Sequence, residues 1–177
     1  MAEKMDAIAL LKADHRKVEE LFEKFEKAKS DSVKKSLVEQ ICTELSIHAT
    51  IEEEIFYPAC SAVEVEEDLM NEAYVEHDGA KVMIAELLAS DPSHEFYDAK
   101  VKVLSEEIKH HVKEEEKPGE GIFAQARKAE VDMDELGARL AARKEELMAE
   151  IKANGIPAPK TRSFTGHKMS QGQPLSA

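Results

Sequence analysis

Four histidines and two glutamates stand at positions where a helical repeat would place apolar side chains. They are His15, His48, Glu52, His77, His111 and Glu115. Burying an unpaired carboxylate costs on the order of several kcal/mol, so a buried cluster of these residues needs a compensating charge. Imidazole nitrogens combined with carboxylate oxygens suit Fe, Mn or Zn, whereas Ca²⁺ and Mg²⁺ prefer oxygen ligands alone. The residue types therefore predict a site for two metal ions bridged by glutamate.

The spacing of these residues repeats along the chain. His15 and His48 are 33 residues apart, His77 and His111 are 34 residues apart, and the pattern His-x-x-x-Glu occurs at both 48–52 and 111–115. A spacing of four residues places imidazole and carboxylate on one face of a helix. The alternative is a network without metal, in which every donor and acceptor of the cluster must find a partner inside the protein.

The elements that must position these residues are helices. Stretches rich in Ala, Glu, Lys and Leu alternate with short breaks that contain Ser, Asp, Pro or Gly, and no strand-type alternation is present. The pattern predicts helices over 4–29, 32–62, 67–90 and 94–116. Short connections favour antiparallel neighbours, so we expect an all-α fold with an up-down-up-down antiparallel four-helix bundle.

The chain continues beyond the four helices. A further helical stretch is predicted over 121–153, packed outside the bundle, and the Gly- and Pro-rich residues after it predict a flexible basic tail. The expected division is a bundle over 1–125, an accessory C-terminal helix over 126–153 and a tail over 154–177. The tail is a possible contact for a protein partner.

Composition excludes several classes of function. The chain has 177 residues and a net charge of −13, which repels a phosphate backbone, so no nucleic acid partner is expected. Its N-terminus is charged and it has no apolar run long enough for a membrane span, so neither export nor a membrane partner is expected. Its two cysteines are too few for a disulfide scaffold, which favours a reducing, cytoplasmic setting.

In order and spacing, these residues resemble the hemerythrin-like family, whose cation-binding signature is His, HxxxE, His and His plus carboxylate on four successive helices. The resemblance covers about residues 5–125. The segments that carry it are Asp14-His15, His48 to Pro58, Glu76-His77-Asp78 and His111 to Glu115.

The resemblance implies two non-heme iron ions with an oxo or hydroxo bridge in the core of the bundle. His15 and His48 would bind one iron, His77 and His111 the other, and Glu52 and Glu115 would bridge them. His110 also precedes a carboxylate at a family spacing, but His111 continues the apolar stripe of its helix and is therefore preferred.

One position departs from the oxygen-carrier pattern. That pattern has HxxxH on the third helix, whereas His77 is followed four residues later by Lys81. One iron is therefore short of a histidine. Water, Tyr74 on the same stripe, or a carboxylate such as Glu19 could take its place.

The resemblance and the residues together suggest three functions. The leading interpretation is a di-iron protein that binds or senses a small oxidant, namely O₂, nitric oxide or peroxide. The alternatives are a di-iron enzyme with catalase-like or oxidoreductase activity, and an iron-handling or iron-dependent regulatory protein.

Overall fold

The computed structural model of the protein describes residues 5–165, and this part of the chain is helical with no strand. This confirms the predicted all-α class. Its elements are α1 (Ala7–Lys27), α2 (Asp31–Ile51), the π-helix η1 (Glu52–Phe56), α3 (Tyr57–Ser61), α4 (Glu67–Leu88), α5 (Tyr97–Glu115), α6 (Ile122–Lys128) and α7 (Met133–Asn154).

Polar side chains cap the N-termini of α1, α2 and α7. Oδ1 of Asp6 accepts a hydrogen bond from the amide of Ala9 at 2.7 Å, and Asp132 caps α7 in the same way. Ser30 caps α2, so the predicted break between the first two helices occurs where the sequence indicated it. Such caps satisfy amide groups that the first turn of a helix leaves without partners.

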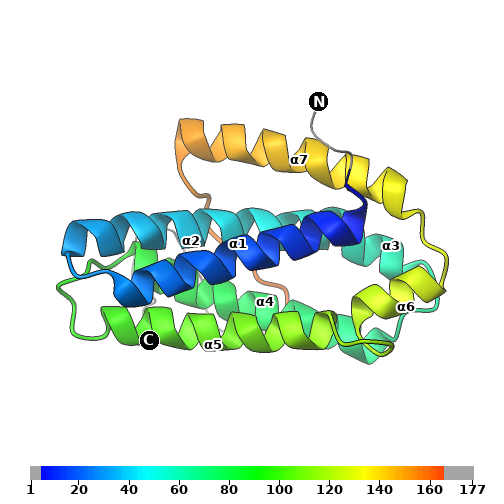
Figure 1. The fold of residues 1–177 in the computed structure, drawn as a ribbon, viewed down its shortest axis with the longest axis horizontal. Coiled ribbons are helices and arrows are strands. Elements are labelled where there is room, and N and C mark those ends of the chain that lie inside the picture. Colours follow the sequence, from blue (N-terminus) through cyan, green and yellow to red (C-terminus); the bar gives the residue numbers. More distant parts are fainter. Residues whose placement is uncertain (1–4, 166–177) are drawn as a thin grey trace.

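Four long helices, α1, α2, α4 and α5, lie side by side and enclose the core (Figure 1). The α1 helix packs against α2 and α5, and α4 packs against the same two helices. The buried apolar side chains form two clusters, one toward each end of these helices. On α1, α2 and α4 the predicted histidine lies between residues of one cluster and residues of the other. On α5 it follows the residues of a single cluster. The polar residues therefore form a layer between two apolar cores.

The predicted helix over 32–62 is not a uniform α-helix. It widens into η1 at Glu52, and the amide of Tyr57 donates to the carbonyl of Glu52, five residues earlier. Pro58 has no amide hydrogen and cannot continue the α-helical hydrogen bonds. The π turn inserts one extra residue into the ladder at this point.

The predicted stretch over 121–153 is two helices rather than one, because the chain breaks at residues 129–132. Glu130 has a positive φ of 58° there, and Asp132 then caps α7. The α7 helix lies outside the four long helices, against α1 and α2, as expected (Figure 1). Gly137 permits this close contact, because a Cβ there would lie 2.5 Å from the carbonyl oxygen of Met5.

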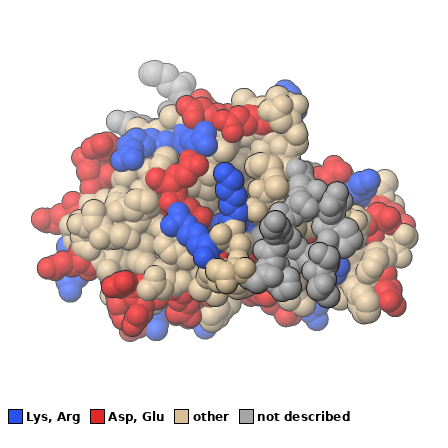
Figure 2. Space-filling view, turned by 180° about the vertical axis from the view of Figure 1, so that it is seen from behind, with Lys and Arg blue, Asp and Glu red and all other residues tan. Residues whose placement is uncertain are grey.

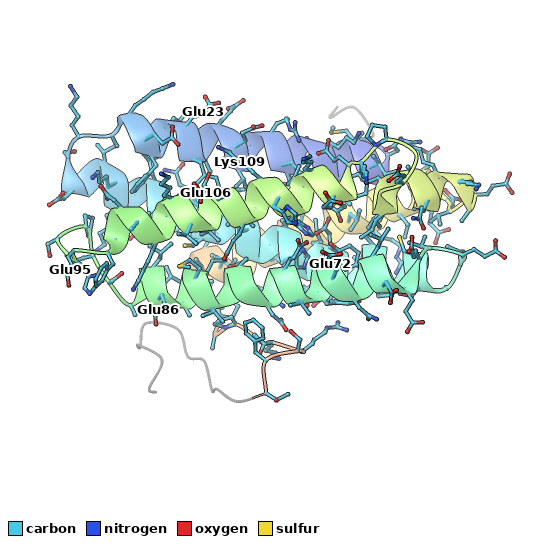
Figure 3. All side chains as sticks on the ribbon, turned by 90° about the horizontal axis from the view of Figure 1, so that it is seen from below. Glu23, Glu72, Glu86, Glu95, Glu106 and Lys109 are labelled. Atoms are coloured by element: carbon cyan, nitrogen blue, oxygen red, sulfur yellow. The ribbon has the colours of Figure 1, made fainter. Side chains whose placement is uncertain are left out.

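The segment predicted as a flexible tail has two parts. Residues 166–177 lie outside the described residues. Residues 155–165 turn back from the end of α7 and pass along the outer side of α4 (Figure 3). Ile156 is buried in the core there, and residues 162 and 163 hydrogen-bond to Asp78.

Acidic and basic side chains are interleaved over the face seen in Figure 2. Among the helices within residues 5–165, none has an apolar stretch that could cross a membrane.

Candidate metal centre

The first half of the centre joins α1 and α2. Nε2 of His15 lies 3.0 Å from Nε2 of His48, which in turn lies 3.2 Å from Oε2 of Glu52. Oε2 of Glu115, from α5, approaches Nε2 of His15 at 3.4 Å. All four side chains are buried, and their potential ligand atoms lie within 4.8 Å of one another. Two imidazoles and two carboxylates thus face a common point.

The second half joins α4 and α5. Nε2 of His77 lies 3.2 Å from Nε2 of His111 and 3.3 Å from Oε2 of Glu52. Oε2 of Glu115 lies 3.8 Å from Nε2 of His111. Glu52 therefore belongs to both groups of ligand atoms, and Glu115 reaches a histidine of each pair. This is the arrangement of two carboxylates between two pairs of imidazoles.

The two glutamates are buried more completely than their hydrogen bonds justify. Glu52 and Glu115 are 0% and 2% exposed. Oε1 of Glu52 and Oε2 of Glu115 accept no hydrogen bond within the described residues. An oxygen left unpaired in the core costs free energy unless a further group binds it. The donor set, with four nitrogens and carboxylate oxygens pointing inward, fits transition-metal ions of the iron and zinc type.

A carboxylate stands behind each histidine. The pairs, with the distance from histidine Nδ1, are His15 and Glu116 at 2.7 Å, His48 and Asp14 at 3.6 Å, His77 and Glu53 at 3.1 Å, and His111 and Glu76 at 2.7 Å. At the three shorter distances an Nδ1–H donates to the carboxylate, which directs Nε2, the nitrogen that could bind a metal, at the centre. Outer carboxylates of this kind orient the rings and increase their basicity as ligands.

The sequence alone assigned none of these four carboxylates to the site. Glu53 and Glu116 stand in glutamate runs, which usually form solvated helix faces, but their side chains are only 12% and 19% exposed. Glu54, the neighbour of Glu53, does lie at the surface, where it pairs with Arg143. Which member of a glutamate run turns inward depends on where the neighbouring helix lies, and no local pattern reveals it.

The electrostatics of the centre favour the charged form of His48 and His77 when no metal is bound. Burial opposes the charged form of His48, but Glu52 and Asp14 outweigh it and raise its pKa to about 10. His77 follows the same balance, and Glu52 and Glu53 raise its pKa to about 9. Burial likewise opposes ionisation of Glu52, yet His48 and His77 hold its pKa well below the usual range. Protons therefore occupy the place that cations would take.

Tyr57 also belongs to the cluster, although the sequence did not predict it as a ligand. Its hydroxyl donates to Oε1 of Glu115 at 2.9 Å and lies 3.3 Å from both Oε2 of Glu52 and Nε2 of His77. In an α-helix a residue five positions after Glu52 would point about 140° away from it. The π turn brings it back to the same side. Pro58 is the signal that could have indicated this turn.

The two side chains considered as substitutes for the missing histidine, Tyr74 and Glu19, do not join the inner cluster. The ring of Tyr74 packs edge-to-face on the ring of Tyr57, with 5.4 Å between the two centroids. Tyr57, and not Tyr74, places its hydroxyl in the cluster. Glu19 lies at the surface, where it pairs with Arg16. Lys81 does not donate to the centre, because its Nζ donates to Glu53 at 2.6 Å.

His110 lies outside the inner cluster. Its side chain is 61% exposed, whereas that of His111 is 5% exposed and faces the other histidines. His110 instead forms a surface group with Glu72 and Glu76 on the side of α4 toward α5, where Figure 3 labels Glu72.

A small cavity adjoins the histidines on the side of one apolar core. Its volume is about 30 Å³, and its apolar walls include Val18, Leu45, Ala80, Ile84 and Ile108. All four histidines also contribute to its lining. A cavity holds one water at about 10–15 Å³, so this one has room for a molecule of two or three heavy atoms.

Comparison with known proteins gives the family and the fold. A solved structure of a hemerythrin HHE cation binding domain-containing protein from Mycobacterium kansasii superimposes with a TM-score of 0.69 at 24% identity, over 85% of this chain and 94% of that one. A protein named DNA nickase from Nostoc sp. strain PCC 7120 is 29% identical over 107 residues, which are 60% of this chain but 30% of that protein. The family model of the hemerythrin HHE cation binding domain matches residues 6–118. The chain therefore belongs to the hemerythrin HHE cation-binding family.

Proposed function

We propose that the protein is a non-heme di-iron protein that binds or senses a small oxidant such as O₂, nitric oxide or peroxide. The observation that carries this proposal is the position of Glu52 and Glu115. Each lies between the two histidine pairs, and each has a buried oxygen that accepts no hydrogen bond within residues 5–165. The proposed scaffold is an up-down-up-down bundle of α1, α2, α4 and α5.

In this proposal His15 and His48 would hold one ion, and His77 and His111 would hold the other. Glu52 and Glu115 would bridge the two. The hydroxyl of Tyr57, 3.3 Å from Nε2 of His77, would adjoin the ion on that side. Iron bound there would supply redox chemistry and an affinity for small oxidants, and the surrounding apolar side chains would keep water away from it.

The cavity beside the histidines supports a small ligand. Its volume of about 30 Å³ suits a diatomic molecule or a peroxide. Its apolar walls favour a neutral ligand such as O₂ or nitric oxide, because a charged one would lose its hydration on entry. The net charge of −13 repels phosphate, so the proposed function does not include a DNA substrate.

A second candidate is a di-iron enzyme with catalase-like or oxidoreductase activity. Tyr57 favours it, because a phenol can hold a proton beside the centre where an imidazole ligand could not. Burial and the charges of Glu115 and Glu52 raise the pKa of Tyr57 well above its usual range, so the proton stays on its hydroxyl oxygen in the metal-free protein. A third candidate, an iron-handling or regulatory protein, would use the dependence of the buried cluster on bound cations.

One experiment separates the first two functions, ligand binding and catalysis. Iron content is measured first, and the oxidised protein is then mixed with azide or nitric oxide, and separately with peroxide. A binding or sensing protein gives a reversible change in its absorption spectrum without sustained consumption. An enzyme continues to evolve O₂ from peroxide, or to consume a reductant, over many cycles. A protein purified from iron-supplemented cells without stoichiometric metal would contradict both.

Both cysteines, Cys42 and Cys60, are free and buried thiols. A reducing, cytoplasmic setting remains part of the proposal, as does a protein partner that contacts the C-terminal tail.

A further inference from the structure

We propose that residues 156–163 form a strap that closes the His77 side of the centre, and that Arg162 in this strap is a positioning residue for Glu53 and, through Glu53, for His77. This inference rests on the proposed function, because it concerns access to the proposed ions and their retention.

The strap is anchored on the residue that follows His77. The amides of Arg162 and Ser163 donate to Oδ2 of Asp78 at 2.9 and 2.6 Å, and the hydroxyl of Ser163 donates to the same oxygen at 2.6 Å. Asp78 is only 1% exposed. Three donors on one buried carboxylate oxygen form a specific attachment, because hydrogen bonds to charged groups are stronger than neutral ones.

Two further features hold the strap in place. Ile156, where the strap begins, is buried in the apolar cluster to which Ile84 and Leu87 of α4 also belong. Near its other end, the carbonyl of Lys160 accepts a hydrogen bond from Nζ of Lys81 at 3.0 Å. The strap is therefore buried in the core at its start and bound to α4 near its end, and Figure 3 shows it beside that helix.

Arg162 connects the strap to the ring of His77. Oε1 of Glu53 lies 3.1 Å from Nδ1 of His77 and accepts from Nζ of Lys81 at 2.6 Å, while its Oε2 lies 3.7 Å from Nε of Arg162. Two cations thus hold the carboxylate that orients the histidine. Histidine ligands depend on such outer carboxylates for their orientation.

The same guanidinium covers the aromatic side of the centre. It stacks 4.4 Å above the ring of Tyr74, which packs edge-to-face on Tyr57. The hydroxyl of Tyr57 belongs to the inner cluster. Arg162, Tyr74 and Tyr57 therefore form a continuous series of contacts from the exposed guanidinium to the centre.

The other outer carboxylates do not depend on this strap. Asp14, behind His48, pairs with Lys144 of α7, and Glu116, behind His15, pairs with Arg16 of α1. Among the described residues, only the Glu53 position draws a cation from the segment that follows α7. Release of the strap should therefore affect the His77 side selectively.

The test uses the full chain and four variants. Arg162→Ala removes the stacked cation, and Ser163→Pro removes two of the three hydrogen bonds to Asp78 without changing α4. Lys160→Ala is the matched control: it removes one positive charge from the same segment, whereas the contact of Lys160 is made by its backbone carbonyl. Arg162→Lys restores the charge without the planar group that stacks on Tyr74.

Two quantities are measured. Amide hydrogen exchange of the 156–165 peptide in the metal-free protein reports attachment of the strap. The rate at which a chelator extracts iron from the loaded protein reports its effect on the centre. We expect both rates to rise about tenfold or more in Ser163→Pro, since even one hydrogen bond to a charged group is worth about that factor. In Arg162→Ala the rise should be smaller, about twofold to fivefold, because its exposed ion pair with Glu53 at 3.7 Å is weak. Lys160→Ala should match the wild type, and Arg162→Lys should recover part of the loss.

Three results would overturn the proposal. The first is rapid exchange of the 156–165 peptide in the wild-type protein, which would mean that the strap is not attached. The second is faster exchange with an unchanged rate of iron extraction, which would mean that the strap does not act on the centre. The third, absence of stoichiometric iron, would remove the proposed function as well, whereas the first two remove the strap proposal alone.

Discussion

The hydroxyl of Tyr57 donates a hydrogen bond to Oε1 of Glu115 across the centre of the helical core, at 2.9 Å. The contact exists because η1 widens the second helix by one residue and turns Tyr57 toward Glu52 and α5. π turns of this kind occur frequently at functional sites. The π turn therefore adds the hydroxyl of Tyr57 to the polar groups around the proposed ions.

Replacement of this hydroxyl should affect both stability and metal binding. In Tyr57→Phe, Oε1 of Glu115 loses its donor, and we expect the metal-free protein to lose about 1–3 kcal/mol of unfolding free energy. The loaded protein should bind iron less tightly on the His77 side. Urea unfolding and iron content measure the two effects. Tyr97→Phe is the control, because it removes a hydroxyl from a buried ring of the other apolar cluster. Equal iron content and stability for Tyr57→Phe and wild type would contradict this role.

The metal-free protein should lose stability as the pH rises. The pKa values of His48 and His77 in the folded state are raised to about 10 and about 9, from 6.5 in the unfolded chain. Between about pH 6.5 and these values the folded state binds more protons, so the stabilisation is complete below pH 6.5 and is lost as the pH rises through the folded pKa values. Urea unfolding at pH 6.5, 8 and 9 measures the trend.

The same titration gives two checks. His48→Gln should flatten the dependence, whereas His110→Gln, which changes an exposed side chain, should leave it intact. Metal affinity should rise with pH over the same range, because protons and cations compete for the same nitrogens. A metal-free protein whose stability increases from pH 6.5 to 9 would be inconsistent with the charged cluster described above.

The α7 helix should unfold together with the four long helices. Leu140 is 0% exposed and belongs to the apolar cluster that contains Leu11 and Phe56. Leu140→Ala should therefore cost about 2–5 kcal/mol of unfolding free energy. Met148→Ala on the same helix removes a side chain that is 36% exposed and should change the value by less than about 0.5 kcal/mol. A separate, early transition for α7 in Leu140→Ala would indicate an independent unit instead.

The sequence allowed the inner histidines and glutamates to be predicted because each interrupts an apolar stripe of helical period. His111 could be preferred over His110 on the same ground, and the structure buries His111 and exposes His110. The helical class followed equally from periodicity and breaks. These features are local, so one sequence is enough to reveal them.

The remaining features depend on tertiary contacts. Glu53 turns toward His77, while Glu54 pairs with a residue of α7, and the two are adjacent members of one glutamate run. Attachment of the tail segment to Asp78 likewise depends on where α7 ends. Pro58 was a local signal for the widened turn, but the direction in which Tyr57 then points required the helix geometry.

The central claim is that the two histidine pairs and the two glutamates enclose two iron ions. Anomalous diffraction at the iron edge, from crystals of the protein prepared with iron, tests it most directly. Two peaks per chain are predicted, about 3–4 Å apart as in other sites with two metals. One should lie beside His15 and His48 and the other beside His77 and His111, with Glu52 and Glu115 between them. Absence of anomalous density among these six side chains, or a single peak elsewhere on the protein, would contradict the claim.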